Sequence, residues 1–277
     1  MERMELLYGI HPVLEALRAR PADLDRIIVA RGARETAGKP DARLEDLVAA
    51  CRAANVRTSF QSRDQLTKLT NTDTHQGVIA YARPRRFLTV EDLIATPAPA
   101  GRNRFFLALD GVEDPHNLGA ILRTAEAVGI DGVIIPERRA APVTATVAKS
   151  SAGATEHVRI ARVPNLVRAL ELLKAANVWS VGLDERGTTD YDRFDFLPDT
   201  VLVLGREGEG LHQLTRRTCD HLLRIPMAGR VASLNVSVAG AVVLYEAARQ
   251  RRAAIAAALA PATPHAKIEK PRRGLGS

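Results

Sequence analysis

The chain has 277 residues, 46% of them apolar, which excludes a disordered protein and leaves room for more than one domain. Its formal net charge of +7 suits a polyanionic partner, because cationic side chains that neutralise phosphates release counterions. The alternative interpretation of this charge is a soluble protein with ordinary surface lysines and arginines. Part of the excess lies in a tail that carries Lys267, Lys270, Arg272 and Arg273, so the body is only mildly basic.

Cysteine usage and the N-terminus bear on the compartment. Cys51 and Cys219 are far apart and form neither a disulfide framework nor a zinc-ligand spacing, so we expect a reducing cytoplasm and no metal. The N-terminus contains acids where a signal peptide is basic, and no apolar run is long enough to span a bilayer. Aromatic residues make up only 4%, which favours contacts to phosphate and ribose over base-stacking platforms.

Residues 1–83 alternate apolar helices and strands, which predicts a small α/β domain. In the first helix, Leu14 and Leu17 share one face. The predicted elements are helices at 13–19 and 44–54 and strands at 27–30, 56–60 and 77–82, with a polar loop at 34–41.

Residues 84–102 predict a linker. The run 95–101 is Ala-Thr-Pro-Ala-Pro-Ala-Gly, whose prolines lack backbone donors and whose small side chains cannot fill a core, so we expect a semi-extended connector. A second α/β domain then covers residues 103–252, and residues 253–277 form a basic tail that we expect to be disordered.

The second domain again alternates strands and helices, and by itself this alternation predicts a doubly wound, Rossmann-like sheet. Its predicted strands are 105–109, 132–135, 178–183, 201–204 and 222–226. Its predicted helices are 117–128, 143–150, 166–175 and a long helix that opens at Ser233.

Two strand ends and a helix start converge on one predicted ligand site. The buried strand 201–204 opens into a loop with Gly205, Gly208 and Gly210, and the crevice beyond such strand ends usually binds ligands. A P-loop is excluded because no Lys-Ser or Lys-Thr follows the glycines. A dinucleotide fingerprint fails because the spacing differs and Ile225-Pro226 stand where an acid is needed. Spacing alone leaves a plain glycine-rich turn equally open.

Three stretches together resemble the three motifs of the SpoU (TrmH) family of S-adenosylmethionine-dependent RNA ribose 2'-O-methyltransferases. They are NLGAILR at 117–123, LGREGEG at 204–210 and IPMAGRVASLNVS at 225–237. The first domain, with YGIHPV at 8–13 and HQGV at 75–78, resembles the substrate-binding domain found ahead of the SpoU domain in bacterial 23S rRNA guanosine methyltransferases. His75 and Gln76 either contact RNA or cap backbone groups, with the capping role slightly favoured.

The resemblance implies a fold and a set of site residues. The fold is a C-terminal α/β trefoil-knot (SPOUT) domain, which periodicity alone does not predict, working as a homodimer. The implied cofactor, S-adenosylmethionine, is held by Leu204, Gly205, Gly208, Ile225, Met227 and Leu234. The implied catalytic residues are Arg123, Asn117, Glu207, Ser233 and Asn235.

Arg123 has two possible roles. The resemblance makes it the residue that takes the 2'-hydroxyl proton, but a guanidinium normally keeps its proton above pH 12. The alternative is that Arg123 clamps a neighbouring phosphate and stabilises the developing alkoxide. His116 is the rival base on pKa grounds and ranks below Arg123. Glu207 is expected to orient Arg123 or to hold the substrate, and Ser233 also fits the N-cap of the final helix.

The expected function is therefore 2'-O-methylation of RNA, most consistently of a guanosine of 23S rRNA in the peptidyl-transferase region, with no DNA or membrane partner. Another rRNA site or tRNA remains open as the substrate. A noncatalytic RNA-binding ribosome-assembly factor and a nucleotide-dependent oxidoreductase are the alternatives from other classes.

Overall fold

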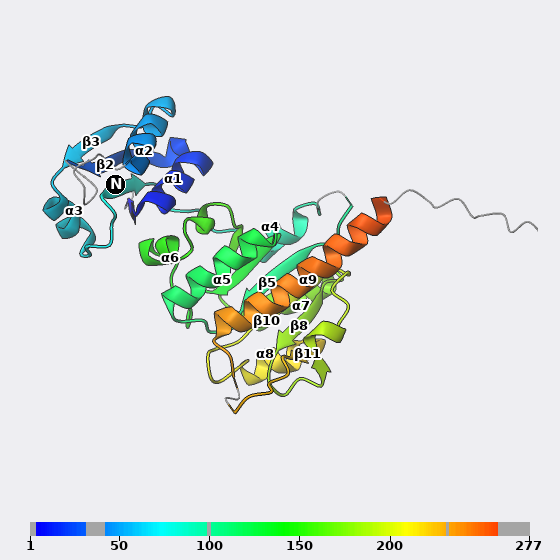
Figure 1. Cartoon of the computed structure of the whole chain (residues 1–277). Coiled ribbons are helices and arrows are strands. Elements are labelled where there is room, and N and C mark those ends of the chain that lie inside the picture. The colour runs from blue at the N-terminus through cyan, green and yellow to red at the C-terminus, as the bar shows by residue number, and fades with distance from the viewer. Residues whose placement is uncertain (1–3, 32–41, 99–100, 231–232, 260–277) are drawn as a thin grey trace, which may run out of the picture.

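The computed structural model describes residues 4–31, 42–98, 101–230 and 233–259. It shows a small N-terminal α/β domain beside a larger domain with a long C-terminal helix (Figure 1). The predicted polar loop at 34–41 and most of the predicted basic tail lie outside the described residues. Within the described part of the chain, no helix is long and apolar enough to cross a membrane.

The N-terminal domain is a four-stranded sheet of order β1-β4-β2-β3, in which β2 and β3 are parallel and the other pairs antiparallel. Val13 and Leu47 belong to the core that the first two helices form with the sheet, and Leu66 of the third packs with Ile28 and Ile79. The elements are β1 (Glu5–Tyr8), α1 (Ile10–Ala19), η1 (Pro21–Asp23), β2 (Leu24–Ala30), α2 (Ala42–Ala53), β3 (Thr58–Gln61), α3 (Arg63–Thr70) and β4 (Val78–Ala82).

The larger domain follows, and its elements confirm the predicted alternation of strands and helices, with several short elements that were not predicted. They are α4 (Val90–Ala95), β5 (Phe105–Leu109), α5 (Pro115–Ala127), β6 (Gly132–Pro136), α6 (Ala145–Ser150), η2 (Ala154–Glu156), β7 (Ile160–Val163), α7 (Leu166–Ala175), β8 (Trp179–Leu183), β9 (Thr189–Asp190), η3 (Tyr191–Arg193), β10 (Thr200–Leu204), α8 (Gln213–Thr218), β11 (His221–Arg224) and α9 (Val236–Leu259).

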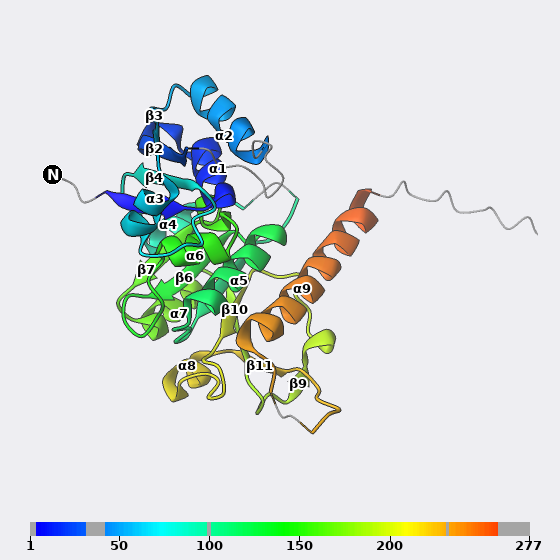
Figure 2. The ribbon, with the colours of Figure 1, turned by 60° about the vertical axis from the view of Figure 1, so that its left-hand side comes forward.

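The seven strands form a parallel sheet of order β7-β6-β5-β10-β8-β11-β9. Every residue of β5 and β10 is buried, as expected for central strands covered on both faces. Leu107 and Leu202 belong to the core that includes α5 and α9, whereas Phe106 and Val203 belong to the core that includes α4 and α7 (Figures 1 and 2). Because all strands run the same way, the loops after β5, β6, β8 and β10 meet at one edge.

The expected linker at 84–102 is only partly an extended connector, and we correct that expectation here. Leu88 exchanges backbone hydrogen bonds with Ile160 and Arg162 around β7, and α4 buries Val90 and Leu93 in the core of the larger domain. The sequence carries the signal for α4, because Thr89 and Asp92 form a capping box. At the other end, α9 continues helical to Leu259, past the border expected at Arg252.

The two domains share a packed interface at α6 and η2. Ala148 of α6 is buried in the core of the N-terminal domain. The Glu156 side chain is fully buried between two arginines, with Arg20 Nε donating to Oε2 at 2.8 Å and Arg85 Nη2 lying 2.8 Å from Oε1. Buried charges of this kind are stable only when paired, so the ion pairs hold the domains in one arrangement.

We expect Glu156→Gln to lower the free energy of unfolding by about 1–3 kcal/mol, because the mostly buried Arg85 loses its carboxylate and Arg20 keeps only one carboxylate contact, the longer one to Glu5 at 3.4 Å. Thermal unfolding and limited proteolysis between the domains measure the effect. Glu15→Gln is the matched control, since Glu15 is more exposed and pairs with His157 and Arg18 at the rim. Equal losses in both variants would contradict a special role for Glu156.

Candidate active site

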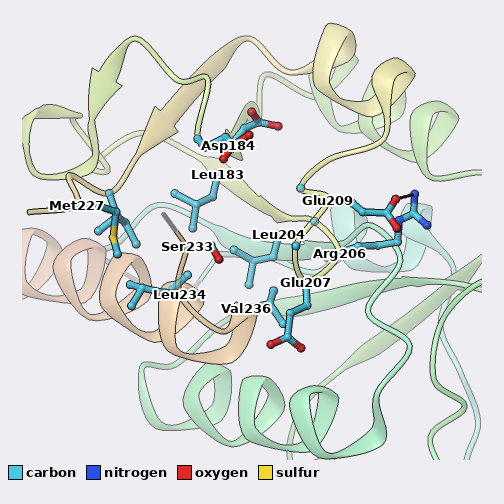
Figure 3. Close-up of a pocket in the computed structure, with 16 residues that line it drawn as sticks. Leu183, Asp184, Leu204, Arg206, Glu207, Glu209, Met227, Ser233, Leu234 and Val236 are labelled. Atoms are coloured by element: carbon cyan, nitrogen blue, oxygen red, sulfur yellow. Dashed lines mark ion pairs between the residues drawn. The ribbon is translucent and has the colours of Figure 1, made fainter. Parts of the chain in front are cut away.

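A pocket opens where the loops after β8, β10 and β11 meet the start of α9 (Figure 3). It encloses about 780 Å³ of space, part of it open to solvent. All six residues predicted to hold a cofactor line it, together with Glu207 and Ser233 of the predicted catalytic set. The predicted site residues in the lining are Leu204, Gly205, Glu207, Gly208, Ile225, Met227, Ser233 and Leu234.

The glycine-rich loop after β10 is a closed backbone turn. The N–H of Arg206 donates to the Gly210 carbonyl, and the N–H of Gly210 donates to the Arg206 carbonyl, both at 3.0 Å. Gly205 has no room for a side chain, since an added Cβ would lie 2.2 Å from the Gly210 carbonyl carbon and 2.5 Å from the Leu211 nitrogen. The glycine at 205 is therefore required by the close approach of two backbone segments.

Gly205→Ala is expected to lower affinity for the predicted cofactor, S-adenosylmethionine, at least tenfold, because the loop must open to admit the methyl group. The free energy of unfolding should also fall by about 1–3 kcal/mol, as for other overpacked sites. Calorimetric titration with S-adenosylmethionine and thermal unfolding measure both. Gly229→Ala is the control, since a Cβ there meets nothing within 4 Å. Normal binding by Gly205→Ala would show that the loop is more pliable than its geometry indicates.

Helix α8 anchors the exit of this loop to two strand ends. Asp110, after β5, accepts hydrogen bonds from the N–H and Nδ1 of His212 at 2.8 and 2.9 Å. Asp184, after β8, is buried with its Oδ2 atom 3.7 Å from Nη1 of Arg216. His212 and Arg216 are one helical turn apart, so carboxylates on both sides of β10 hold α8 in place.

Most of the charged side chains that line the pocket are acidic. Asp184, Glu185, Glu207 and Glu209 line it, and the one basic residue in the lining, Arg206, pairs with Glu209 at 2.5 Å. Figure 3 shows Leu204, Leu234 and Val236 gathered around the same space, with Glu207 turned toward α5. An apolar floor with an acidic rim suits a cationic nucleoside and disfavours a phosphate-bearing one.

Three predicted catalytic residues form one hydrogen-bonded network. Asn117 Nδ2 donates to Glu207 Oε2 at 2.9 Å, and Asn235 Nδ2 donates to Glu207 Oε1 at 3.1 Å and to Asn117 Oδ1 at 2.9 Å. Asn117 lies in the first turn of α5 and is buried, while Asn235 precedes α9. The network therefore joins the glycine-rich loop to the starts of both helices.

The remaining predicted polar residues lie outside this network. Arg123 is exposed on α5, nearly two turns after Asn117. In the described part of the chain it has no hydrogen bond or ion pair. Glu207 therefore orients Asn117 and Asn235 rather than Arg123. His116 is exposed and its backbone N–H donates to Asp114. Ser233 lines the pocket but does not cap α9; the helix begins at Val236, and Asn235 Oδ1 accepts the N–H of Ser237.

His75 and Gln76 have structural roles, which confirms the favoured interpretation. His75 is fully buried, where its Nδ1 accepts the N–H of Gly77 and its Nε2 contacts Thr67 Oγ1. Gln76 Oε1 accepts the N–H of Ile10. This hydrogen bond joins the two short motifs of the N-terminal domain, YGIHPV at 8–13 and HQGV at 75–78.

Sequence reasoning missed the contribution of the loop after β8. Leu183, Asp184 and Glu185 line the pocket beside the glycine-rich loop. A signal was present, because two acids directly follow a predicted buried strand at the edge where ligands bind. Burial and the charges of Asp220, Asp110 and Asp184 raise the pKa of the Cys219 thiol to about 12.

Comparison with known proteins identifies the class. The profile of the SpoU rRNA Methylase family matches residues 104–245, and that of RNA 2'-O ribose methyltransferase substrate binding matches residues 6–88. The chain belongs to the SpoU rRNA methylase family.

Curated relatives match nearly the whole chain. The 23S rRNA (guanosine-2'-O-)-methyltransferase RlmB of Vibrio cholerae is 43% identical, over 90% of this chain and 98% of its own. The protein of the same name from Escherichia coli is 41% identical, over 89% of this chain and 99% of its own.

Solved structures share the fold. The SpoU methyltransferase AviRb from Streptomyces viridochromogenes, in complex with AdoMet, superposes with a TM-score of 0.73 at 27% identity over 90% of each chain. The AdoMet-bound rRNA methyltransferase from Sinorhizobium meliloti gives a TM-score of 0.71 at 26% identity, covering 89% of this chain and 87% of that one. The predicted SPOUT fold class is thus confirmed.

Proposed function

We propose that this protein transfers a methyl group from S-adenosylmethionine to the 2'-hydroxyl of a guanosine ribose in 23S rRNA, in the peptidyl-transferase region. The observation that carries the proposal is the acidic, apolar-floored pocket joined through Glu207 to the Asn117 and Asn235 network. Two relatives over 40% identical across about nine tenths of the chain are named as 23S rRNA (guanosine-2'-O-)-methyltransferases, which supports the substrate. Such a substrate implies action in the cytoplasm.

The pocket fits the cofactor by its chemistry. S-adenosylmethionine supplies a methyl group on a positively charged sulfonium, so the transfer requires no metal. Leu204, Ile225 and Leu234 provide apolar surface for the adenine, and the closed backbone turn after Gly205 presents polar groups to its edge. The carboxylate of Glu185 provides acceptors for ribose hydroxyls and for positive charge. A NAD-type cofactor would bring its phosphates to this acidic lining, which disfavours the oxidoreductase alternative.

The residues of the chain contribute mainly by orientation. The network of Asn117, Glu207 and Asn235 holds the loop and two helix starts in fixed positions, so that a hydroxyl is presented in line with the methyl group. Arg123, which carries a free guanidinium on the same helix as Asn117, clamps a phosphate and stabilises the alkoxide that develops. Ser233 at the mouth of the pocket hydrogen-bonds to the substrate.

The functional unit in this proposal is a homodimer. Helix α9 exposes Val238 and Tyr245, about half accessible each and two turns apart, beside α5 on the same face of the sheet (Figures 1 and 2). A second copy of the chain packed against α9 would bury both Val238 and Tyr245. Light scattering should therefore give about twice the 30.0 kDa mass of one chain, and Tyr245→Asp should shift that mass toward one chain.

Incubation with labelled S-adenosylmethionine and deproteinised 23S rRNA, followed by mapping of ribose methylation, tests the function directly. One methylated guanosine in the peptidyl-transferase region is the expected result. Transfer only to tRNA would replace the substrate, and cofactor binding without any transfer would favour a noncatalytic assembly factor.

A further inference from the structure

Loop 137–144, between β6 and α6, lies at the edge of the sheet that carries the active site. Strand β6 pairs in parallel with β5, and β5 pairs in parallel with β10, so all three end together. Neighbouring strands are about 4.8 Å apart, which puts this loop roughly 10 Å from the glycine-rich loop after β10. The N–H of Ala141 donates to the Val112 carbonyl at 2.9 Å, two residues before Asp114, which caps α5.

Arg139 in this loop adopts a left-handed backbone conformation, with φ of +55°. Such values favour glycine or asparagine and cost free energy for other residues. Three of the six non-glycine residues with positive φ in the described part of the chain are asparagines. The positive φ of Gln76 is explained by the hydrogen bond that its side chain accepts from Ile10. Ala152 has a small side chain and lies just after α6. Arg139 is thus the one long side chain in this set without a contact that would explain it.

Both Arg138 and Arg139 are exposed, and within the described ranges neither has a hydrogen bond or an ion pair. Glu137 and Glu113 are also exposed, and in the described part of the chain neither forms an ion pair with Arg138 or Arg139. The backbone around them is held firmly, since the N–H of Glu137 donates to Val163 and Ala141 is buried in the core. A rigid backbone with two free guanidinium groups is suited to an anion that lies outside the protein.

The loop also leads toward the N-terminal domain. It leads into α6, which lies between α5 and the N-terminal domain (Figures 1 and 2). Arg138 and Arg139 therefore lie on the segment that joins the active-site edge of the sheet to the helix packed against the N-terminal domain.

We infer that Arg138 and Arg139 form a clamp for the phosphodiester backbone of the RNA next to the methylated ribose. This inference rests on the proposed function and adds to it a surface that selects and holds RNA without taking part in cofactor binding. The strained conformation of Arg139 is kept because a guanidinium at this position binds phosphate in two-point fashion, which asparagine or glycine cannot do.

Arg139→Asn tests the clamp, because asparagine tolerates the backbone conformation and removes the cation. Its melting temperature and S-adenosylmethionine affinity should equal or exceed those of the wild type. Its affinity for a 23S rRNA transcript should fall roughly tenfold, as for a lost charge-assisted contact. The slope of the logarithm of the RNA association constant against the logarithm of the salt concentration should become less steep by roughly 0.7–0.9, the value for one phosphate contact. Arg139→Lys should retain the salt slope with intermediate affinity.

Arg252→Asn is the matched control, since Arg252 is an exposed arginine near the C-terminal end of α9, next to Arg251, which binds the start of the sheet at Arg104. It should leave RNA affinity unchanged. If the wild type methylates RNA and Arg139→Asn keeps its RNA affinity and salt slope, the clamp is overturned while the proposed function stands. If the wild type neither binds nor methylates RNA, the proposed function fails and the clamp with it.

Discussion

Replacing Arg123 by lysine is expected to lower the single-turnover rate of methylation about 10²- to 10³-fold, and replacement by alanine should lower it at least as far. Lysine keeps the charge but loses the planar fork that binds a phosphate at two points. Affinity for S-adenosylmethionine should stay nearly unchanged, because Arg123 does not line the pocket. The melting temperature should stay unchanged too, because the side chain is exposed and makes no bond within the described chain.

His116→Ala provides the comparison for the Arg123 variants. His116 is exposed at the first turn of the same helix, and we expect its loss to change the rate far less. Single-turnover methylation at saturating cofactor separates chemistry from binding. Near-normal rates in both arginine variants, with a collapse in His116→Ala, would make the histidine the base and overturn the role given to Arg123.

Glu207→Gln is expected to lower kcat about 10²-fold or more while binding of S-adenosylmethionine changes less than tenfold. Both oxygens of Glu207 accept hydrogen bonds from amide groups, at 2.9 Å from Asn117 and 3.1 Å from Asn235. A glutamine amide turns an N–H₂ toward one of these donors, which breaks one bond and sets two donors against each other. The two helix starts then lose their common anchor.

Glu209→Gln in the same loop is the matched control. It removes the same charge from the pocket rim, but Glu209 is 64% exposed and pairs only with Arg206. Its activity should remain close to normal. Combining Asn117→Ala with Glu207→Gln should cost little more than either change alone, because both break one network. Additive losses, or a larger effect in Glu209→Gln than in Glu207→Gln, would contradict the network's role.

Several elements were missed although their local signals were present. Helix α3 begins at a capping box formed by Ser62 and Gln65, and α4 begins at one formed by Thr89 and Asp92. Helix α3 buries only Leu66, so it lacks the apolar stripe that predicts a helix. The prediction of an extended linker is wrong over α4, because this helix has only six residues and is followed directly by the proline-rich run beyond Ala95.

Local sequence is enough to predict the strands β5 and β10, the glycine-rich loop and the family, because continuous apolar runs and three ordered motifs are local properties of the chain. How distant segments meet depends on tertiary packing. Asn117 and Glu207 bond across 90 residues because β5 and β10 are neighbours in the sheet, and strand order is not written in local periodicity. The acids after β8 join the pocket, and His75 turns inward, for the same reason: contacts between segments far apart are set by packing.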